Sequence, residues 1–280
     1  MNRIKIVLSY VIGFISATLL VGLILLLIAK FTILNKNYVN RTLEKYDYYE
    51  KVNKEINEEM ELQLLSSGFT NEILENVYTK DEIFEDINLF IDNAYQGKLI
   101  KFDKSNVRQN IEVNIDNYFK KTKLTVINKQ DLSNFVSDLV LIYENEIGLY
   151  HLADSIVIKI SKIEKIVNIS IIVVCILLVS CILIFLLYIK TKIFNSILIS
   201  SGLIILFIRL FVFEKIDVDY LLIITENFSE ILRNLLNNFI DISLIISLIL
   251  IIIGIFTLIY ESMCKPKKKK LLFDWVFLKS

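Results

Sequence analysis

The chain has 280 residues, of which 55% are hydrophobic and 22% are charged, and it contains only 7 glycines and 1 proline. This apolar content and a mean hydropathy of +0.57 exclude an ordinary soluble domain, and the scarcity of turn residues argues against a turn-rich all-β fold. Because the net charge is +0, no global attraction to nucleic acid exists. The apolar content and the scarcity of turn residues together predict an all-α membrane protein.

The first predicted element is an uncharged apolar run from Ile6 to Ala29, preceded by Arg3 and Lys5. The run is long enough to cross a hydrocarbon core of about 30 Å. A signal peptide has a shorter apolar core and a small-residue cleavage motif, which the exit sequence IAKFTILNK lacks. We therefore expect residues 1–30 to form a short N-terminal stub and an uncleaved first span.

Residues 31–165 form the longest polar segment, which is large enough for one domain. Apolar residues recur there at helical spacing, first at Val39, Leu43, Tyr46, Tyr49, Val52, Ile56 and Met60. The sequence TKDE at residues 79–82 matches a capping box, Gly97 is expected to end that helix, and Asn128 is expected to cap a later one. The pattern predicts a helical bundle, with a few extended residues near 99–102.

Charge is unevenly distributed along this segment. Residues 31–97 hold 6 basic and 14 acidic side chains, residues 98–130 hold 8 and 3, and residues 131–165 hold 3 and 6. The basic middle block suits an anionic polymer or lipid headgroups. Opposed blocks more often meet within one bundle or form solvated faces, which is the interpretation we prefer.

The segment also contains a possible cation site. Asp81, Glu82, Glu85 and Asp86 lie on adjacent turns of one predicted helix, and such oxygen ligands suit Ca²⁺. However, the spacing lacks an EF-hand loop, and acidic residues are expected in the first turns of a helix because of its dipole. His151 is the only histidine. We therefore predict no metal site, no cofactor and no catalytic residues.

The second and third spans are predicted within residues 166–213. Apolar runs cover Ile166–Ile189 and Ile193–Phe213, and the turn between them is so short that they must form an antiparallel hairpin. Residues 214–238 then form a connector with an amphipathic stripe, expected along the outer interface or beneath the large domain. The stripe consists of Phe228, Ile231, Leu232, Leu235 and Leu236.

Residues 239–260 form the fourth span and residues 261–280 a basic tail. With four spans, Arg3 and Lys5, then Lys190 and Lys192, fall on the same side as the tail lysines, which are Lys265, Lys267, Lys268, Lys269 and Lys270. The positive-inside rule predicts a multi-pass protein of the plasma membrane with both termini in the cytoplasm and residues 31–165 outside.

The tail lysines are expected to set this topology and to contact anionic lipid, at about 1 kcal/mol each. After them, residues 271–280 read LLFDWVFLKS. This sequence suits a tail lying in the membrane interface or a docking segment for a cytoplasmic partner.

Arg209 and Asp241 are the only charges expected within the spans. They lie near the outward ends of spans three and four, so we hypothesise an ion pair between them. Serines at small-xxx-small spacing, Ser196 with Ser200 and Ser243 with Ser247, favour close packing of the same two spans.

The stretches NYVNRTLEKYDYYEKVNKEI (37–56) and SGFTNEILENVYTKDEIFEDINLFIDNAYQGK (67–98) resemble uncharacterised four-span integral membrane proteins of low-GC Gram-positive bacteria with a helical outer domain. The composition, rich in Ile, Lys and Asn, fits an AT-rich genome. No activity is established for that group, so the resemblance transfers no functional residues.

The leading hypothesis is a non-enzymatic integral membrane protein. Its outward helical domain would bind, sense or scaffold a membrane or envelope partner, or a second copy of the chain, without binding nucleic acid. The alternative is a channel or transporter subunit formed by oligomerised spans. An envelope enzyme is disfavoured by the single histidine and by the absence of catalytic motifs.

Overall fold

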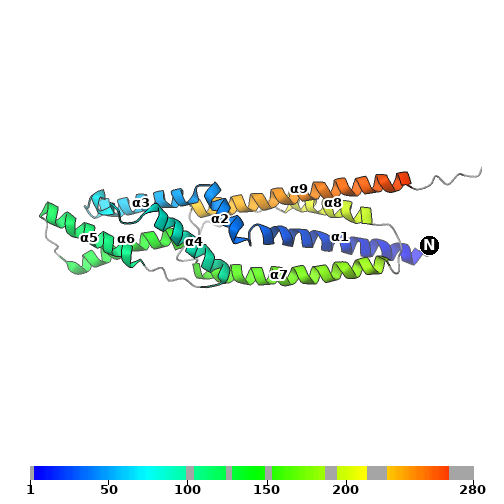
Figure 1. Cartoon of the computed structure of the whole chain (residues 1–280), viewed down its shortest axis with the longest axis horizontal. Helices are drawn as coiled ribbons and strands as arrows, with labels where there is room; N and C mark the ends of the chain where they lie inside the picture. The colour runs from blue at the N-terminus through cyan, green and yellow to red at the C-terminus, as the bar shows by residue number, and fades with distance from the viewer. Residues whose placement is uncertain are drawn as a thin grey trace, which may run out of the picture. The chain divides into compact units, whose positions relative to one another are not determined.

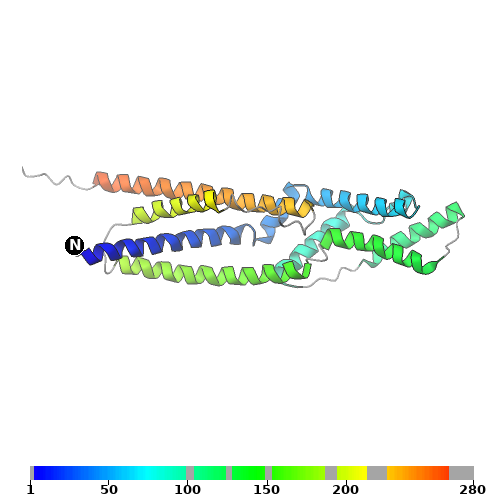
Figure 2. The same cartoon turned by 180° about the vertical axis from the view of Figure 1, so that it is seen from behind.

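The computed structural model describes residues 3–98, 104–123, 128–148, 153–186, 194–212 and 226–264. Over these residues every regular element is a helix, and none is a strand (Figures 1 and 2). The elements are α1 (Arg3–Phe31), α2 (Lys36–Lys45), α3 (Tyr48–Ser66), the short 3-10 helix η1 (Asn71–Leu74), α4 (Lys80–Gln96), α5 (Ser105–Thr122), α6 (Lys129–Gly148), α7 (Ala153–Ile184), α8 (Phe194–Phe211) and α9 (Glu226–Cys264).

Four of these helices are long and apolar enough to span a membrane, judged by length and composition. The candidate spans are Val7–Phe31, Lys159–Ile184, Phe194–Phe211 and Asn227–Met263. Each overlaps one of the four runs predicted from the sequence. The all-helical architecture and the four apolar helices are therefore confirmed.

The chain divides into two compact units. Unit 1 comprises Met1–Ile24, Val174–Phe213 and Ser243–Ser280, and unit 2 comprises Leu25–Val173 and Glu214–Ile242. Helices α1, α7 and α9 contribute residues to both units. Helix α8 belongs to unit 1 alone, and α2 to α6 belong to unit 2 alone.

Unit 1 is held together by close approach of helix backbones. A Cβ atom added to Gly202 of α8 would lie 2.7 Å from the carbonyl oxygen of Ser247 on α9, and one added to Gly254 of α9 would lie 2.6 Å from Cγ1 of Ile199 on α8. The hydroxyl of Ser201 donates to the carbonyl of Ala17 on α1 at 3.2 Å. Small residues thus let α8 approach both neighbours, as is common between membrane helices.

The predicted serine pattern is half correct. Ser243 and Ser247 are fully buried on α9. On α8, in contrast, Ser196 is exposed and Ser200 is only partly buried. The contact instead uses Ser201 and Gly202, because the buried face of α8 is displaced by one residue, which corresponds to about 100° around an α-helix.

Unit 2 has an apolar core of its own. Helix α3 packs against α4 and α6, and α5 packs against α6 and η1. The core includes fully buried side chains from each of these elements, namely Ile56, Met60, Leu64, Ile73, Ile83, Ile111, Ile115, Leu139, Tyr143 and Ile147. Each such side chain contributes roughly 1.5–3 kcal/mol of hydrophobic stabilisation relative to exposure.

The helix ends of unit 2 follow the predicted signals. Thr79 and Glu82 form the capping box at the start of α4, and Gly97 ends this helix in the left-handed conformation at φ 68°. Asn128 accepts a hydrogen bond from the backbone N–H of Gln130 at 2.9 Å. Local side-chain chemistry therefore fixes where α4 and α6 begin and where α4 ends.

The helical pattern expected to continue through residues 39–60 is interrupted. Asp47 adopts the left-handed conformation at φ 53°, which separates α2 from α3. The interruption changes which residues lie inside, because Tyr48 is buried in the core whereas its neighbours Tyr46 and Tyr49 are only partly buried. A second turn, between Phe31 and Lys36, separates α1 from α2, so the bundle's first helix does not continue directly from the first span.

The amphipathic stripe and the fourth span belong to one helix, because α9 is unbroken from Glu226 to Cys264. Ile231 and Leu235 of the stripe are buried in the core of unit 2. Of the two places expected for the stripe, this burial favours the one beneath the large domain. The expected extended residues 99–102, His151 and the tail lysines lie outside the described residues.

Candidate functional site

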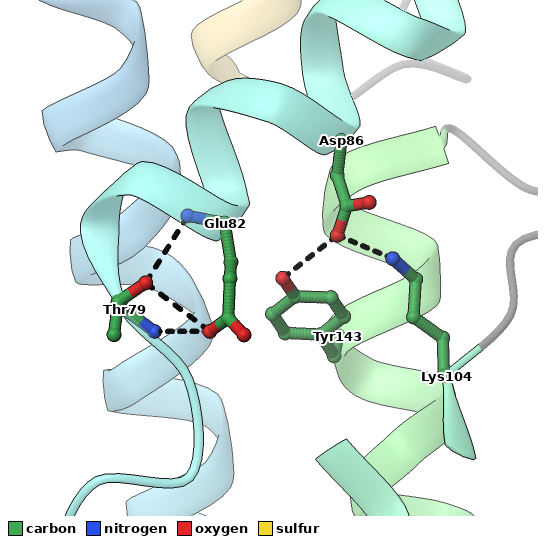
Figure 3. Close-up of polar contacts among 5 residues, drawn as sticks. All are labelled: Thr79, Glu82, Asp86, Lys104 and Tyr143. Atoms are coloured by element: carbon green, nitrogen blue, oxygen red, sulfur yellow. Dashed lines mark hydrogen bonds and ion pairs between the residues drawn. The ribbon is translucent and has the colours of Figure 1, made fainter. Parts of the chain in front are cut away.

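A buried polar cluster joins three helices of unit 2. Asp86 of α4 binds the ammonium group of Lys104, the residue before α5, and also accepts a hydrogen bond from the hydroxyl of Tyr143 on α6 at 2.9 Å (Figure 3). The Lys104 side chain is only 6% exposed. Its nitrogen lies 5.0 Å from the centre of the Tyr143 ring, within the range of a cation–π interaction.

The cluster extends to α3 through aromatic contacts. The ring of Tyr143 lies against that of Tyr78 with centroids 5.1 Å apart, and the Tyr78 hydroxyl donates to Oδ1 of Asn57 on α3 at 2.9 Å. Buried polar atoms are costly unless they are hydrogen-bonded. Each polar group in this series of contacts has a partner, so the series holds the helices of unit 2 in one register.

The electrostatics of this cluster oppose acid–base catalysis by its phenols. Burial, and secondarily the negative charge of Asp86, raises the pKa of Tyr143 well above its usual value. Burial likewise raises the pKa of Tyr78. Both side chains therefore stay protonated at physiological pH, where they can donate hydrogen bonds but cannot act as bases.

A second ionisable cluster lies one helical turn further along α6. Glu146 of α6 is 8% exposed, and the carboxyl group of Glu55 on α3 is close enough to affect its pKa. Burial, followed by the neighbouring carboxyl group of Glu55, raises the pKa of Glu146 to about 8. The buried Tyr48 lies in the same cluster, and burial with the charges of both carboxyl groups raises its pKa.

An open groove lies beside the first cluster, between the start of α5 and α6. It has a volume of about 560 Å³ and is lined by Lys104, Ser105, Arg108, Ser137, Asp138, Val140, Leu141 and Glu144. Arg108 donates to the hydroxyl of Ser137 at 2.5 Å and contacts Glu112 at 3.3 Å. The two cations that line the groove, Lys104 and Arg108, already bind other groups of unit 2. The positive charge of the groove is therefore largely compensated within the protein.

Residues at the end of α4 lie close to residues that follow α1 and to a residue of α7. The Tyr95 hydroxyl donates to the carbonyl of Ile33, after α1, at 2.5 Å, and Lys36 at the start of α2 binds Asp92. A Cβ atom added to Gly97 would lie 2.8 Å from Oγ of Ser161 on α7. Helix α4 therefore lies against the residues that follow the first candidate span, and Gly97 after it lies close to Ser161 within the second.

The predicted charge blocks do meet within unit 2. Lys104 of the basic block binds Asp86 of the acidic block, and Lys121 binds Glu72 at 2.7 Å. Within the part of the chain that the structure describes, no group of three acidic, histidine or cysteine side chains could hold a metal ion. Of the four acidic residues considered for Ca²⁺, Glu82 caps α4 and Asp86 binds Lys104.

The predicted pair of Arg209 and Asp241 stays a prediction. Arg209 lies near the end of α8, in unit 1, and is partly buried with its Nε atom shielded from solvent. Asp241 is an exposed residue of α9, in unit 2. The contacts of Lys265, Lys267, Lys268, Lys269 and Lys270 with lipid also stay a prediction, since these residues lie outside the described part.

Sequence reasoning missed both buried clusters. A signal for the second was available, because Glu146 occupies the helical stripe that runs through Leu139, Tyr143 and Ile147, where an apolar residue is expected. No comparable signal marks Lys104, whose burial depends on the fold.

No protein-family model, curated protein or solved structure matches the chain.

Proposed function

We propose that this chain is a four-span membrane protein whose residues 31–165, which form most of unit 2, lie outside the cytoplasmic membrane and bind, sense or scaffold a partner there, without catalysing a reaction. The observation that carries the proposal is the independent apolar core of unit 2. A chain that only had to anchor itself would need no such core between its spans, whereas a partner-binding module requires a fixed surface.

The distribution of basic residues supports the orientation. Lysine and arginine collect before the first span, between the second and third, and at Lys267–Lys270 after the fourth. These three sites fall on one side of a four-span protein, and the positive-inside rule assigns that side to the cytoplasm. Residues 31–165, which supply most of unit 2, then lie on the opposite side.

The surface of α3 supports partner binding. Leu62 and Leu65 lie one turn apart near the end of α3 and are 67% and 64% exposed. They follow Glu58, Glu59 and Glu61 on the same helix. Single exposed leucines are normal on protein surfaces, but two on adjacent turns beside an acidic surface suit a partner that is apolar and basic.

The orientation is tested with single-cysteine variants. Cys175, Cys181 and Cys264 are first replaced by serine, and a cysteine is then introduced by Glu58→Cys or by Lys268→Cys. A membrane-impermeant maleimide should label Glu58→Cys on intact cells and Lys268→Cys only after permeabilisation. The reverse pattern would place unit 2 in the cytoplasm and overturn the proposal.

Partner binding is tested by photo-crosslinking in cells. A photoreactive residue at Leu62 or Leu65 should capture one protein in stoichiometric amount, and the same residue at Lys54 of α3 serves as the control. Purification in detergent followed by mass spectrometry identifies what is retained. If only the chain itself is recovered from both positions, the proposal of a separate partner fails.

A second candidate, a channel or transporter subunit formed by oligomerised spans, is supported by the polar residues that unit 1 buries. These are Ser9, Ser16, Asn195, Ser201, Ser243 and Ser247. Several of their hydroxyls bond to carbonyls of their own helix, which explains them as packing residues. Ion flux into proteoliposomes that contain the purified chain would favour the second candidate.

A further inference from the structure

We propose that a groove between α5 and the first half of α6 binds small zwitterions with an apolar body, the chemical class of the apolar amino acids and their dipeptides. The groove, which we call the Asp116 groove, has a volume of about 330 Å³, within the range of small-molecule sites. It lies wholly within unit 2. The inference therefore depends neither on the side of the membrane that unit 2 faces nor on the exposed leucines of α3.

Each wall of the Asp116 groove is one face of one helix. Helix α5 packs against α6, and the lining residues of each helix recur at helical spacing, which places them on a single face. They are Glu112, Ile115 and Asp116 on α5, and Lys129, Leu132, Ser133 and Val136 on α6. The groove is thus formed by two regular elements.

The floor of the groove is apolar and fixed. Ile115 and Val136 are each 1% exposed and belong to the core of unit 2, and Leu132 packs against that core. Because the floor belongs to a close-packed interior, it cannot move without disturbing the bundle. An apolar group placed on this floor would be removed from water, which is the main source of affinity in small-molecule sites.

The two walls carry opposite charges that do not neutralise each other. Asp116 on α5 and Lys129 on α6 are both exposed, and they line the same groove. Within the described residues, neither side chain forms an ion pair or a hydrogen bond. The groove therefore separates a carboxyl group from an amino group, and both remain available to a ligand.

The other polar groups of the lining do not change this balance. Glu112 contacts Arg108 of its own helix at 3.3 Å. Ser133 lies one turn after Lys129 on the same wall and has a hydroxyl group that can donate or accept. Among the lining residues this leaves one acidic group opposite one basic group, so a simple ion would satisfy only one wall.

A zwitterion with an apolar body satisfies both walls and the floor together. Its ammonium group binds Asp116, its carboxylate group accepts hydrogen bonds from Lys129 and Ser133, and its apolar side chain covers the floor. Hydrogen bonds between oppositely charged groups are stronger than neutral ones. The Lys104 groove lacks this arrangement, because both of its cations already bind groups of unit 2.

The experiment is isothermal titration calorimetry on the full chain in lipid nanodiscs, with empty nanodiscs as the blank. The probes are L-leucine and the longer L-leucyl-L-leucine. Each is compared with its N-acetylated form, which lacks the ammonium group, and with its amide, which lacks the carboxylate group. We expect at least one zwitterion to bind, and both of its modified forms to bind at least about tenfold more weakly.

Two variants assign the charges of the ligand to the two walls. Asp116→Asn should abolish the preference for the free ammonium group and keep the preference for the free carboxylate group. Lys129→Gln should do the reverse. Asp131→Asn and Lys120→Gln are the matched controls, because both residues are exposed on the same two helices and do not line the groove. Both controls should keep both preferences.

A third variant tests the location without changing any charge. Ser133 is exposed, so Ser133→Phe should fill the groove without disturbing the core. We expect it to lose at least about tenfold in affinity while its Tm matches that of the wild type. Unchanged affinity in this variant would place the binding site elsewhere.

The inference fails if the wild type binds neither zwitterion at about 10 mM, or if the acetylated forms and the amides bind as tightly as the zwitterions. It also fails if Asp116→Asn and Lys129→Gln keep both preferences, or if the two control variants lose them equally. None of these results bears on the orientation of unit 2 or on crosslinking at Leu62 and Leu65.

Discussion

The carboxylate of Asp86 binds the ammonium group of Lys104 inside unit 2, where almost none of the lysine side chain reaches solvent. Removing two such charges from water is unfavourable, and their attraction compensates only when further hydrogen bonds complete the geometry. Tyr143 provides such a bond. The ion pair between Asp86 and Lys104 therefore stabilises one arrangement of α4, α5 and α6, because alternative arrangements would leave a buried charge without a partner.

Replacement of Lys104 by methionine tests this interpretation. Lys104→Met keeps the apolar part of the side chain but leaves the Asp86 carboxylate with Tyr143 as its remaining partner in the cluster. We expect the free energy of unfolding to fall by about 3 kcal/mol, measured by chemical denaturation of the full chain in detergent. The double variant Lys104→Met/Asp86→Leu should recover much of the loss, since it leaves no buried charge.

The control for this variant is Lys121→Met. Lys121 also forms an ion pair, with Glu72, but both side chains are more than half exposed, so water screens their attraction. The loss should be much smaller than for Lys104→Met. Equal losses at the two positions would contradict the role given to burial.

Gly202→Ala is expected to disrupt unit 1. The added methyl group would lie within 2.7 Å of atoms of Ser247 and Ile251, so α8 and α9 would have to separate. Gly22→Ala on α1 is the matched control, because a Cβ atom there meets nothing within 4 Å and alanine favours a helix. The Tm should fall for Gly202→Ala and stay level or rise for Gly22→Ala. A Tm unchanged by Gly202→Ala would refute the close contact.

The capping box at the start of α4 should contribute measurably to stability. Thr79→Ala removes the hydroxyl that accepts a hydrogen bond from the backbone N–H of Glu82, and the expected loss is about 1 kcal/mol. Thr79→Ser keeps the hydroxyl and should lose much less. Denaturation of both variants under the same conditions makes the comparison, and similar losses would show that the methyl group of Thr79 matters more than its hydrogen bond.

The role of α9 in unit 2 is tested by truncating one of its core side chains. Leu235 is 5% exposed, and Leu235→Ala should destabilise unit 2 by about 2–5 kcal/mol. Leu248 of the same helix is 45% exposed, so Leu248→Ala is the control. Limited proteolysis of α3 to α6 provides the measurement. If both variants protect these helices equally from proteolysis, α9 does not contribute to the core.

Features determined by neighbouring residues could be predicted from the sequence. The four apolar helices, the capping box of Thr79 and Glu82 and the glycine stop at Gly97 all depend on residues within a few turns of each other. The interruption at Asp47 could not be predicted in this way. An aspartate in the left-handed conformation is uncommon and has no distinctive local pattern, and the apolar spacing continues across it without a break.

The buried clusters depend on contacts between distant parts of the chain. Asp86 and Tyr143 are 57 positions apart, and nothing near either residue identifies the other as its partner. The contact between α8 and α9 illustrates a different difficulty. Ser200 and Ser201 are adjacent and chemically identical, so composition alone does not decide which one faces the neighbouring helix, and the structure selects Ser201.

The burial of Ile231 and Leu235 has a consequence for the order in which the protein matures. Residues of the unit 2 core up to Ile147 leave the ribosome before these two side chains have been made. Until the start of α9 arrives, the growing core has an uncovered apolar surface, and closing it requires contacts between residues far apart in sequence, which form slowly. Newly made unit 2 is therefore expected to be a substrate for chaperones and proteases until translation has passed Leu235.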